Sequence, residues 1–253
     1  SLHMEYGGWL NSKITSDFEK YARICFENFG DKVKNWITLN EPWVTSLLGF
    51  MNGEFAPGRI SNVEPYIVGH NQLIAHAKVA KLFHEEFQPS QNGQIGLACN
   101  CSWFEPKTDS PGDLEASERA LEFSMAWFTD PIYKGDYPEV MKQIVGERLP
   151  EFTDEEKKLL KDSSDFFGLN HYQTYLVEDY NEEKDRTNPN VGLPLNKDEN
   201  VLLSEDLDWE KTFMGWPIVP WGIKKLVQWI DKRYNKPTIV ITENGAAFEE
   251  DKL

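Results

Sequence analysis

The sequence has 253 residues, a formal net charge of −16 at neutral pH and a hydrophobic content of 40%. This length and composition fit one large α/β domain with a sizeable core and exclude a disordered chain. The acidic balance argues against a nucleic acid or an anionic membrane as a partner, because like charges repel. Three cysteines are too few for a disulfide framework or a zinc site. No apolar run reaches the roughly 18 residues of a membrane span and no signal peptide is visible, so neither a cytoplasmic nor a secreted location is favoured.

Two helices are expected in the first 90 residues. Ser16 and Glu19 form a capping box for the first helix, and Gly30 suits its end. Apolar residues at helical spacing predict the buried face of that helix: Phe18, Tyr21, Ala22, Cys25 and Phe29. Ser61 and Glu64 are expected to cap the second helix, and its expected buried stripe consists of Leu73, Ala77, Ala80, Phe83 and Phe87.

Four short apolar runs, each followed by polar residues, predict the strands of a parallel sheet. They are residues 36–39 before Asn40 and Glu41, 95–99 before Asn100, 165–169 before Asn170, and 238–242 before Glu243 and Asn244. The last run is rich in β-branched residues, and we expect it to be a buried strand.

The remaining segments are expected to be helices and loops. Helical patterns cover about 113–128, 139–146, 154–162 and 219–234, and a capping box of Thr153 and Glu156 precedes the third of them. A long loop is expected from Pro42 to about Arg59, and a surface excursion with at most a hairpin over about 175–215. Strands alternating with helices indicate one domain over residues 1–253, with a parallel sheet covered by helices.

The polar ends of the predicted strands indicate a catalytic site. In α/β barrels the chemistry lies at the carboxyl ends of the strands. Two of the four runs place a glutamate beside an asparagine there, at Glu41 and Glu243, which are the parts of a two-carboxylate catalyst. Single asparagines after strands are also ordinary turn residues, and two glutamates at loop starts can simply form ion pairs.

Several motifs resemble family 1 glycoside hydrolases, the (β/α)8-barrel β-glycosidases that include β-glucosidases. The segment 38–42, Thr-Leu-Asn-Glu-Pro, is similar to the acid/base motif of that family, and 241–245, Ile-Thr-Glu-Asn-Gly, to its nucleophile motif. Further matches fall in family order at residues 6–9, 137–138, 165–170 and 214–216. The resemblance covers essentially the whole chain and implies an α/β fold, a partial TIM barrel of about four parallel strands with covering helices.

The resemblance implies a retaining, double-displacement mechanism. Glu243 would attack the anomeric carbon and Glu41 would serve as general acid and then base, with the two carboxyl groups about 5–5.5 Å apart. Asn40 resembles the residue that hydrogen-bonds the sugar 2-hydroxyl. Tyr172 resembles the tyrosine that donates a hydrogen bond to the nucleophile.

Further substrate contacts are also implied by resemblance. Trp43 and Trp216 resemble aromatic platforms on the leaving-group side, and core packing is the alternative for both. Asn100 and Asn170 would either hydrogen-bond the ligand or order the pocket. His171 stands where many family members have tyrosine and is expected to be a variant, not a metal ligand. The resemblance implies no metal and no cofactor.

Only four strands can be assigned, whereas a complete barrel needs eight. Open sheet edges disfavour a monomer, and a homo-oligomer could cover them. The sequence therefore predicts a retaining β-glycosidase acting on a small β-glycoside or an oligosaccharide, in a chain that is a fragment with weak or no activity alone. The alternative is a catalytically inactive truncated homologue that acts as a binding or interaction module.

Overall fold

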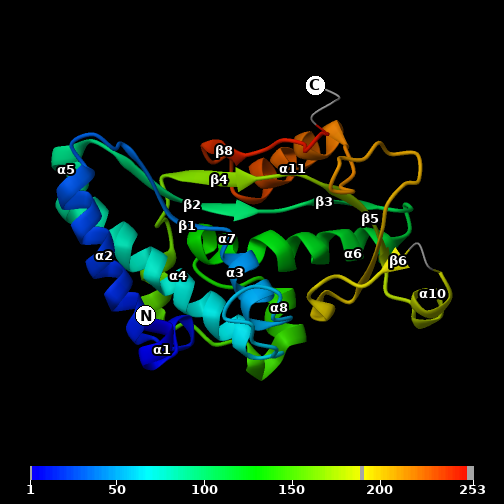
Figure 1. Ribbon diagram of the computed structural model, residues 1–253, viewed down its shortest axis with the longest axis horizontal. Coiled ribbons are helices and arrows are strands. Elements are labelled where there is room, and N and C mark those ends of the chain that lie inside the picture. Colours follow the sequence, from blue (N-terminus) through cyan, green and yellow to red (C-terminus); the bar gives the residue numbers. More distant parts are fainter. Residues whose placement is uncertain (1, 189–190, 250–253) are drawn as a thin grey trace. The chain divides into compact units, whose positions relative to one another are not determined.

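The computed structural model describes residues 2–188 and 191–249 of the chain (Figure 1). Two compact units can be distinguished. The first unit comprises Ser1–Cys99, Ala126–Gly168 and Thr238–Val240, and the second comprises Asn100–Met125, Leu169–Pro237 and Ile241–Leu253. None of the described helices is long and apolar enough to cross a membrane.

The central sheet contains the four strands expected from the sequence. In spatial order they are β1 (Asn35–Asn40), β2 (Gln94–Asn100), β4 (Phe166–Asn170) and β8 (Ile239–Glu243). The sheet is parallel, and β1 pairs with β2 from Asn35 opposite Gln94 to Asn40 opposite Ala98. The predicted strands and their parallel arrangement are thus confirmed.

The expected burial of β8 is wrong. All five residues of β4 are buried, whereas Val240 and Ile241 of β8 are 41% and 45% exposed. The difference follows from position, because β8 is an edge strand and β4 lies inside the sheet. A β-branched apolar run predicts a strand, and the neighbours of that strand determine how far it is buried.

In the first unit, the helices α2 (Lys13–Phe29) and α4 (Glu64–Leu82) pack against each other. Their shared core includes Phe26 and Phe83, whose ring centroids lie 5.0 Å apart. The capping box at Ser16 is wrong, because α2 already begins at Lys13. The predicted face is also partly wrong: Ala22 is buried, but Tyr21 and Phe29 are 61% and 54% exposed. The helix packs against its neighbours through Ala22 and Phe26, so the rings of Tyr21 and Phe29 point toward solvent.

The helix α4 begins at Glu64, close to the predicted start, but Val63 and not Ser61 is its N-cap residue. The Ser61 hydroxyl accepts hydrogen bonds from the backbone N–H groups of Val63 and Glu64, while the Glu64 carboxylate accepts from Arg59. Four residues of its predicted stripe are buried, and Phe87 is partly buried. The loop expected from Pro42 begins instead with a helix, α3 (Pro42–Phe50). Proline at the first helical position has a preset φ, and it needs no N–H partner there.

The other helical segments of the first unit are short. They are α1 (Leu2–Tyr6), η1 (Gly8–Leu10), η2 (Phe83–Phe87), α5 (Gln88–Gln91), α7 (Trp127–Lys134), α8 (Glu139–Val145), η4 (Gly146–Arg148) and α9 (Asp154–Leu160). The capping box of Thr153 and Glu156 at α9 is confirmed in both directions.

The second unit contains a second sheet that was not expected from the sequence. Its strands, in order, are β3 (Trp103–Pro106), β5 (Thr174–Asp179), β7 (Val201–Ser204) and β6 (Val191–Gly192). The strand β5 is parallel to β3 and antiparallel to β7. The helical segments are α6 (Pro111–Leu121), η3 (Glu122–Ala126), α10 (Glu182–Thr187), η5 (Lys197–Glu199) and α11 (Pro220–Arg233). Of η3, the last residue, Ala126, already belongs to the first unit. The excursion expected over about 175–215 contains the hairpin that the sequence suggested, because β6 and β7 pair antiparallel. The pairing of β7 with β5 was not expected.

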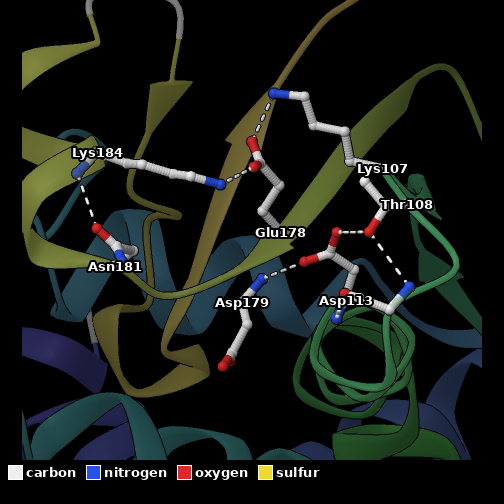
Figure 2. Close-up of polar contacts among 8 residues, drawn as sticks. Lys107, Thr108, Asp113, Glu178, Asp179, Asn181 and Lys184 are labelled. Carbon is white, nitrogen blue, oxygen red and sulfur yellow. Dashed lines mark hydrogen bonds and ion pairs between the residues drawn. The ribbon is translucent and has the colours of Figure 1, made fainter.

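A buried carboxylate ties α10 to the second sheet. Glu178 of β5 is 5% exposed and accepts hydrogen bonds from Lys107 and Lys184, which reach it from two sides (Figure 2). Burial alone would raise the pKa of Glu178, but the two ammonium groups outweigh it and hold that pKa below its usual value. Beside it, Asp113 of α6 accepts from the backbone N–H of Asp179 at 3.0 Å (Figure 2).

Close packing between α11 and the second sheet centres on Gly222. A Cβ atom at this position would lie 2.0 Å from Oγ1 of Thr174 and 3.4 Å from Cβ of Trp103. Thr174 is fully buried and β-branched, so its side chain has little freedom to move away. The helix can therefore approach the sheet only with glycine at this position.

Glu178→Gln is expected to lower the free energy of unfolding at pH 7 by about 2 kcal/mol, because hydrogen bonds to charged groups are lost. Folding lowers this pKa, so the stabilisation is present above the unfolded value of about 4.3 and disappears as the pH falls through the folded value. Thermal unfolding from pH 7 to pH 3 should show the two proteins converging. Glu183→Gln, exposed on α10, is the control. A difference that stays constant with pH would contradict the ion-pair argument.

Gly222→Ala is expected to destabilise the fold by about 2 kcal/mol, because overpacking outweighs the gain in helix propensity. Gly192→Ala is the matched control, since nothing lies within 4 Å of the added Cβ. Denaturant unfolding measures both. Combining Gly222→Ala with Thr174→Ala should recover part of the loss, and no recovery would contradict the contact with Thr174.

Candidate active site

In the first unit, Glu41 stands between a strand and a helix in a strained backbone conformation. Its φ and ψ are 48° and 61°, in the left-handed region. The backbone N–H of Glu41 donates to the carbonyl of Ala98 at 2.8 Å, and its carbonyl accepts from the N–H of Thr45 at 3.2 Å. Left-handed backbone costs a non-glycine residue roughly 1–2 kcal/mol, and such strain gathers at functional sites.

A buried polar network holds the turn that follows Glu41. The carbonyl of Pro42 accepts from the Ser46 hydroxyl at 2.8 Å and from Nε2 of Gln72 at 3.2 Å, and Gln72 also donates to Ser46 at 3.0 Å. Gln72 is only 1% exposed. It is not among the residues predicted for the site, although a glutamine within the apolar stretch of α4 was a signal for such a role.

The other predicted site residues of the first unit differ in exposure. Asn40 is exposed and Trp43 is half-buried. The indole N–H of Trp43 is buried, and no atom of the described residues accepts a hydrogen bond from it. Burial, followed by the nearby Glu41 carboxylate, raises the pKa of the Cys99 thiol. This thiol therefore stays protonated at neutral pH and is a poor nucleophile.

In the second unit, Glu243 is the last residue of β8, and Tyr172 aims its carboxylate. The Tyr172 hydroxyl donates to Oε2 of Glu243 at 2.7 Å. The ring of Tyr172 packs against Trp216, with centroids 5.6 Å apart and planes inclined by 58°. Three of the predicted site residues thus form one continuous group.

The carboxyl ends of β4 and β8 are joined by hydrogen bonds around Glu243. The backbone N–H of His171 donates to the carbonyl of Glu243 at 3.1 Å, and Nδ2 of Asn244 donates to the carbonyl of His171 at 2.6 Å. The hydroxyl of Thr242 donates to Oδ1 of Asn170. These bonds fix the backbone on both sides of Glu243.

His171 has a structural environment. Its ring is 3% exposed, and Nδ1 donates to the carbonyl of Cys101 at 2.9 Å, since a carbonyl can only accept. Burial lowers the pKa of His171, so the ring is uncharged at neutral pH. Among the described residues, no group of histidine, cysteine, aspartate and glutamate side chains could hold a metal ion.

The two asparagines predicted at strand ends lie in different surroundings. Asn170 is fully buried, and its carbonyl accepts from the backbone N–H of Cys101 at 3.0 Å. The side-chain carbonyl of Asn100 is buried, and no donor of the described residues reaches it. The contacts of Asn170 order the strand ends around Glu243.

Trp216 is held by a tight turn with exposed apolar residues. The N–H of Thr212 donates to the carbonyl of Trp216 at 2.8 Å, and the N–H of Trp216 donates to the Thr212 hydroxyl at 3.1 Å. The N–H of Phe213 donates to the carbonyl of Ala247, a residue of the loop after Glu243. Phe213 and its neighbour Met214 are 70% and 58% exposed, and neither was expected at the site.

Replacing Glu41 offers a test of its backbone strain. Glu41→Gly should be more stable than Glu41→Ala by about 1 kcal/mol, because only glycine adopts this conformation at no cost. At Glu27, exposed within α2, the order should be reversed, since glycine destabilises a helix interior. Urea unfolding of the four variants measures both differences. Equal stability of the two Glu41 variants would contradict the strain.

The model of glycosyl hydrolase family 1 matches residues 1–253. Beta-glucosidase 42 of Arabidopsis thaliana is 45% identical, over 99% of this chain and 52% of the relative. Beta-glucosidase 1B of Phanerodontia chrysosporium is 41% identical, over 99% of this chain and 47% of the relative. The chain thus spans about half the length of the curated relatives that it matches.

Solved structures give the same result. The rice β-glucosidase Os3BGlu6 superposes with a TM-score of 0.90 at 39% identity, over 98% of this chain and 55% of that one. A β-glucosidase from the fungus Humicola insolens, in complex with glucose, superposes with a TM-score of 0.89 at 38% identity, over 100% and 55%. These matches confirm the expected α/β fold, a part of a TIM barrel. On the match of the family model to its whole length, this chain belongs to glycosyl hydrolase family 1.

Proposed function

We propose that this chain carries the two catalytic carboxyl groups of a retaining β-glycosidase that hydrolyses terminal β-linked sugars, as in β-glucosidases. In this proposal Glu243 is the nucleophile and Glu41 is the general acid and base. Membership of the family and the position of each glutamate at the carboxyl end of a parallel strand support these roles.

The proposed reaction has two steps. In the first, an oxygen of Glu243 attacks the anomeric carbon, the glycosidic C–O bond breaks, and the leaving oxygen takes the proton of Glu41. In the second, water attacks the same carbon, Glu41 takes a proton from it, and the ester bond to Glu243 breaks. The products are the free sugar, with its anomeric configuration retained, and the alcohol.

The observation that carries the proposal is the hydrogen bond from Tyr172 to Glu243, at 2.7 Å. A hydroxyl that donates to a carboxylate restricts its rotation, and a nucleophile must be held in one orientation to attack. An ion-pair partner would have indicated a structural glutamate instead. The partner of the Glu243 carboxylate is the neutral hydroxyl of Tyr172.

The substrate is proposed to be a small β-glycoside or an oligosaccharide. The glucose complex of the Humicola insolens relative supports a sugar ligand. Trp216, packed on Tyr172, would offer its half-buried ring to the leaving group, and Asn40 would bind the sugar 2-hydroxyl. Trp43 is proposed as a second aromatic surface. The buried Asn170 would act through Thr242 and not through direct contact with the sugar.

The roles of Glu41 and Glu243 are one matter, and the rate at which this chain alone hydrolyses a glycoside is another. Because the chain spans about half the length of its relatives, we expect slow turnover of nitrophenyl β-glucosides. The same observation favours a second candidate, an inactive homologue that binds sugars or other proteins. The two candidates differ in whether Glu243 can form a covalent glycosyl ester.

Covalent trapping tests the proposal. The chain is incubated with a dinitrophenyl 2-deoxy-2-fluoro-β-glucoside, whose glycosyl ester hydrolyses slowly, and the labelled peptide is identified by mass spectrometry. We expect one sugar on Glu243, and none after Glu243→Gln. An unlabelled wild-type chain would reject hydrolysis and support the binding module.

Glu41→Gln separates the two roles. Dinitrophenolate leaves without protonation, so labelling of Glu243 should persist in this variant. Hydrolysis of a glucoside with a poor leaving group should fall by about 100-fold or more, the usual contribution of general acid–base catalysis. Loss of labelling and of hydrolysis in equal measure would contradict the assignment of Glu41.

A further inference from the structure

The residues on either side of Glu243 are both anchored to the end of β4. Thr242 precedes Glu243, and its hydroxyl donates to Oδ1 of Asn170. Asn170 is fully buried, and its backbone carbonyl accepts from the backbone N–H of Cys101, so the residue that carries the acceptor is held in place. Side chains alternate along a strand, so the hydroxyl of Thr242 and the carboxylate of Glu243 leave β8 on opposite faces.

Asn244 provides the second anchor. Its Nδ2 donates to the carbonyl of His171 at 2.6 Å, while the N–H of the same His171 donates to the carbonyl of Glu243 at 3.1 Å. His171 is itself fixed, because its buried ring is hydrogen-bonded to the carbonyl of Cys101. His171, the residue directly after β4, therefore holds Glu243 and Asn244 through its two backbone groups.

These contacts leave little freedom to the Cα–Cβ bond of Glu243. A strand end can rotate about its own axis and so swing the Glu243 side chain. The bond of Thr242 to Asn170, on the face of β8 opposite to the Glu243 side chain, prevents this rotation. The remaining rotations are those of the glutamate side chain, which Tyr172 restricts by donating to its carboxylate.

We infer that Thr242 and Asn244 are positioning residues for Glu243: by anchoring β8 to Asn170 and His171 they keep the carboxylate within reach of the Tyr172 hydroxyl and aimed at the anomeric carbon. This inference rests on the nucleophile role proposed for Glu243. Thr242 contributes more than Asn244, because Thr242 is partly buried whereas Asn244 is exposed, so water competes more for the hydrogen bond of Asn244.

Displacement of a reacting group by about 1 Å can cost about 100-fold in rate. We therefore expect Thr242→Val, which keeps the shape and removes the hydroxyl, to slow trapping of the fluoroglucoside at least about tenfold. Asn244→Ala should slow it less. Thr242→Ser restores the hydroxyl and should recover most of the wild-type rate. Thr238→Val is the matched control, because Thr238 is exposed and lies just before β8.

A second measurement does not depend on activity. Tyrosine labelled with 13C at Cζ gives one NMR signal for each of the nine tyrosines, and Tyr172→Phe identifies the signal of Tyr172. That carbon reports the hydrogen bond of the hydroxyl to Glu243. Thr242→Val and Asn244→Ala should shift it, and Thr242→Ser and Thr238→Val should leave it in place.

The two measurements together decide the inference. A folded Thr242→Val protein whose Tyr172 signal is unchanged would overturn it, whatever the trapping rate, because the carboxylate would still be in place. Should Thr242→Val fail to fold, as judged by its melting curve, Asn244→Ala decides by the same criterion. A wild-type chain that is not labelled would reject the proposed function alone, and the Tyr172 signal would still test the anchoring.

Discussion

The arrangement of the second unit around its candidate nucleophile depends on hydrogen bonds between the carboxyl ends of two neighbouring strands. His171 supplies the central contact, because its N–H, its carbonyl and its ring each bond to a different partner, namely Glu243, Asn244 and Cys101. A parallel sheet brings strand ends to one edge, but the sheet alone leaves their side chains undirected. The polar residues after β4 and β8 provide that direction.

Much of the fold could be predicted because its signals are local. Short apolar runs that end in asparagine identified the four strands of the parallel sheet, and the capping box at Thr153 identified a helix start. Other signals were ambiguous. Ser16 and Glu19 have capping-box spacing but lie inside α2, where the turn at Ser12 already begins the helix. The exposure of Ile241 and the pairing of β5 with β7 depend on neighbours distant in sequence, which no local pattern reveals.

The candidate site divides in the same way. Glu41, Glu243, Tyr172 and Trp216 were predicted because motifs carry them, and the structure joins the last three in the second unit. Gln72 was not predicted, because its hydrogen bond to the carbonyl of Pro42 forms only when α4 packs beside the turn after Glu41. Thr242 was regarded as part of a strand because β-branched residues favour strands. Its hydroxyl matters through Asn170, a partner 72 positions away.

The left-handed backbone at Glu41 has an evolutionary consequence. At this position glycine would have the lower backbone strain energy, because it adopts the left-handed region without a steric clash. A lineage that had abandoned chemistry would lose little and gain stability by exchanging the glutamate. The glutamate keeps a carboxylate at the end of β1 at the expense of a relaxed backbone.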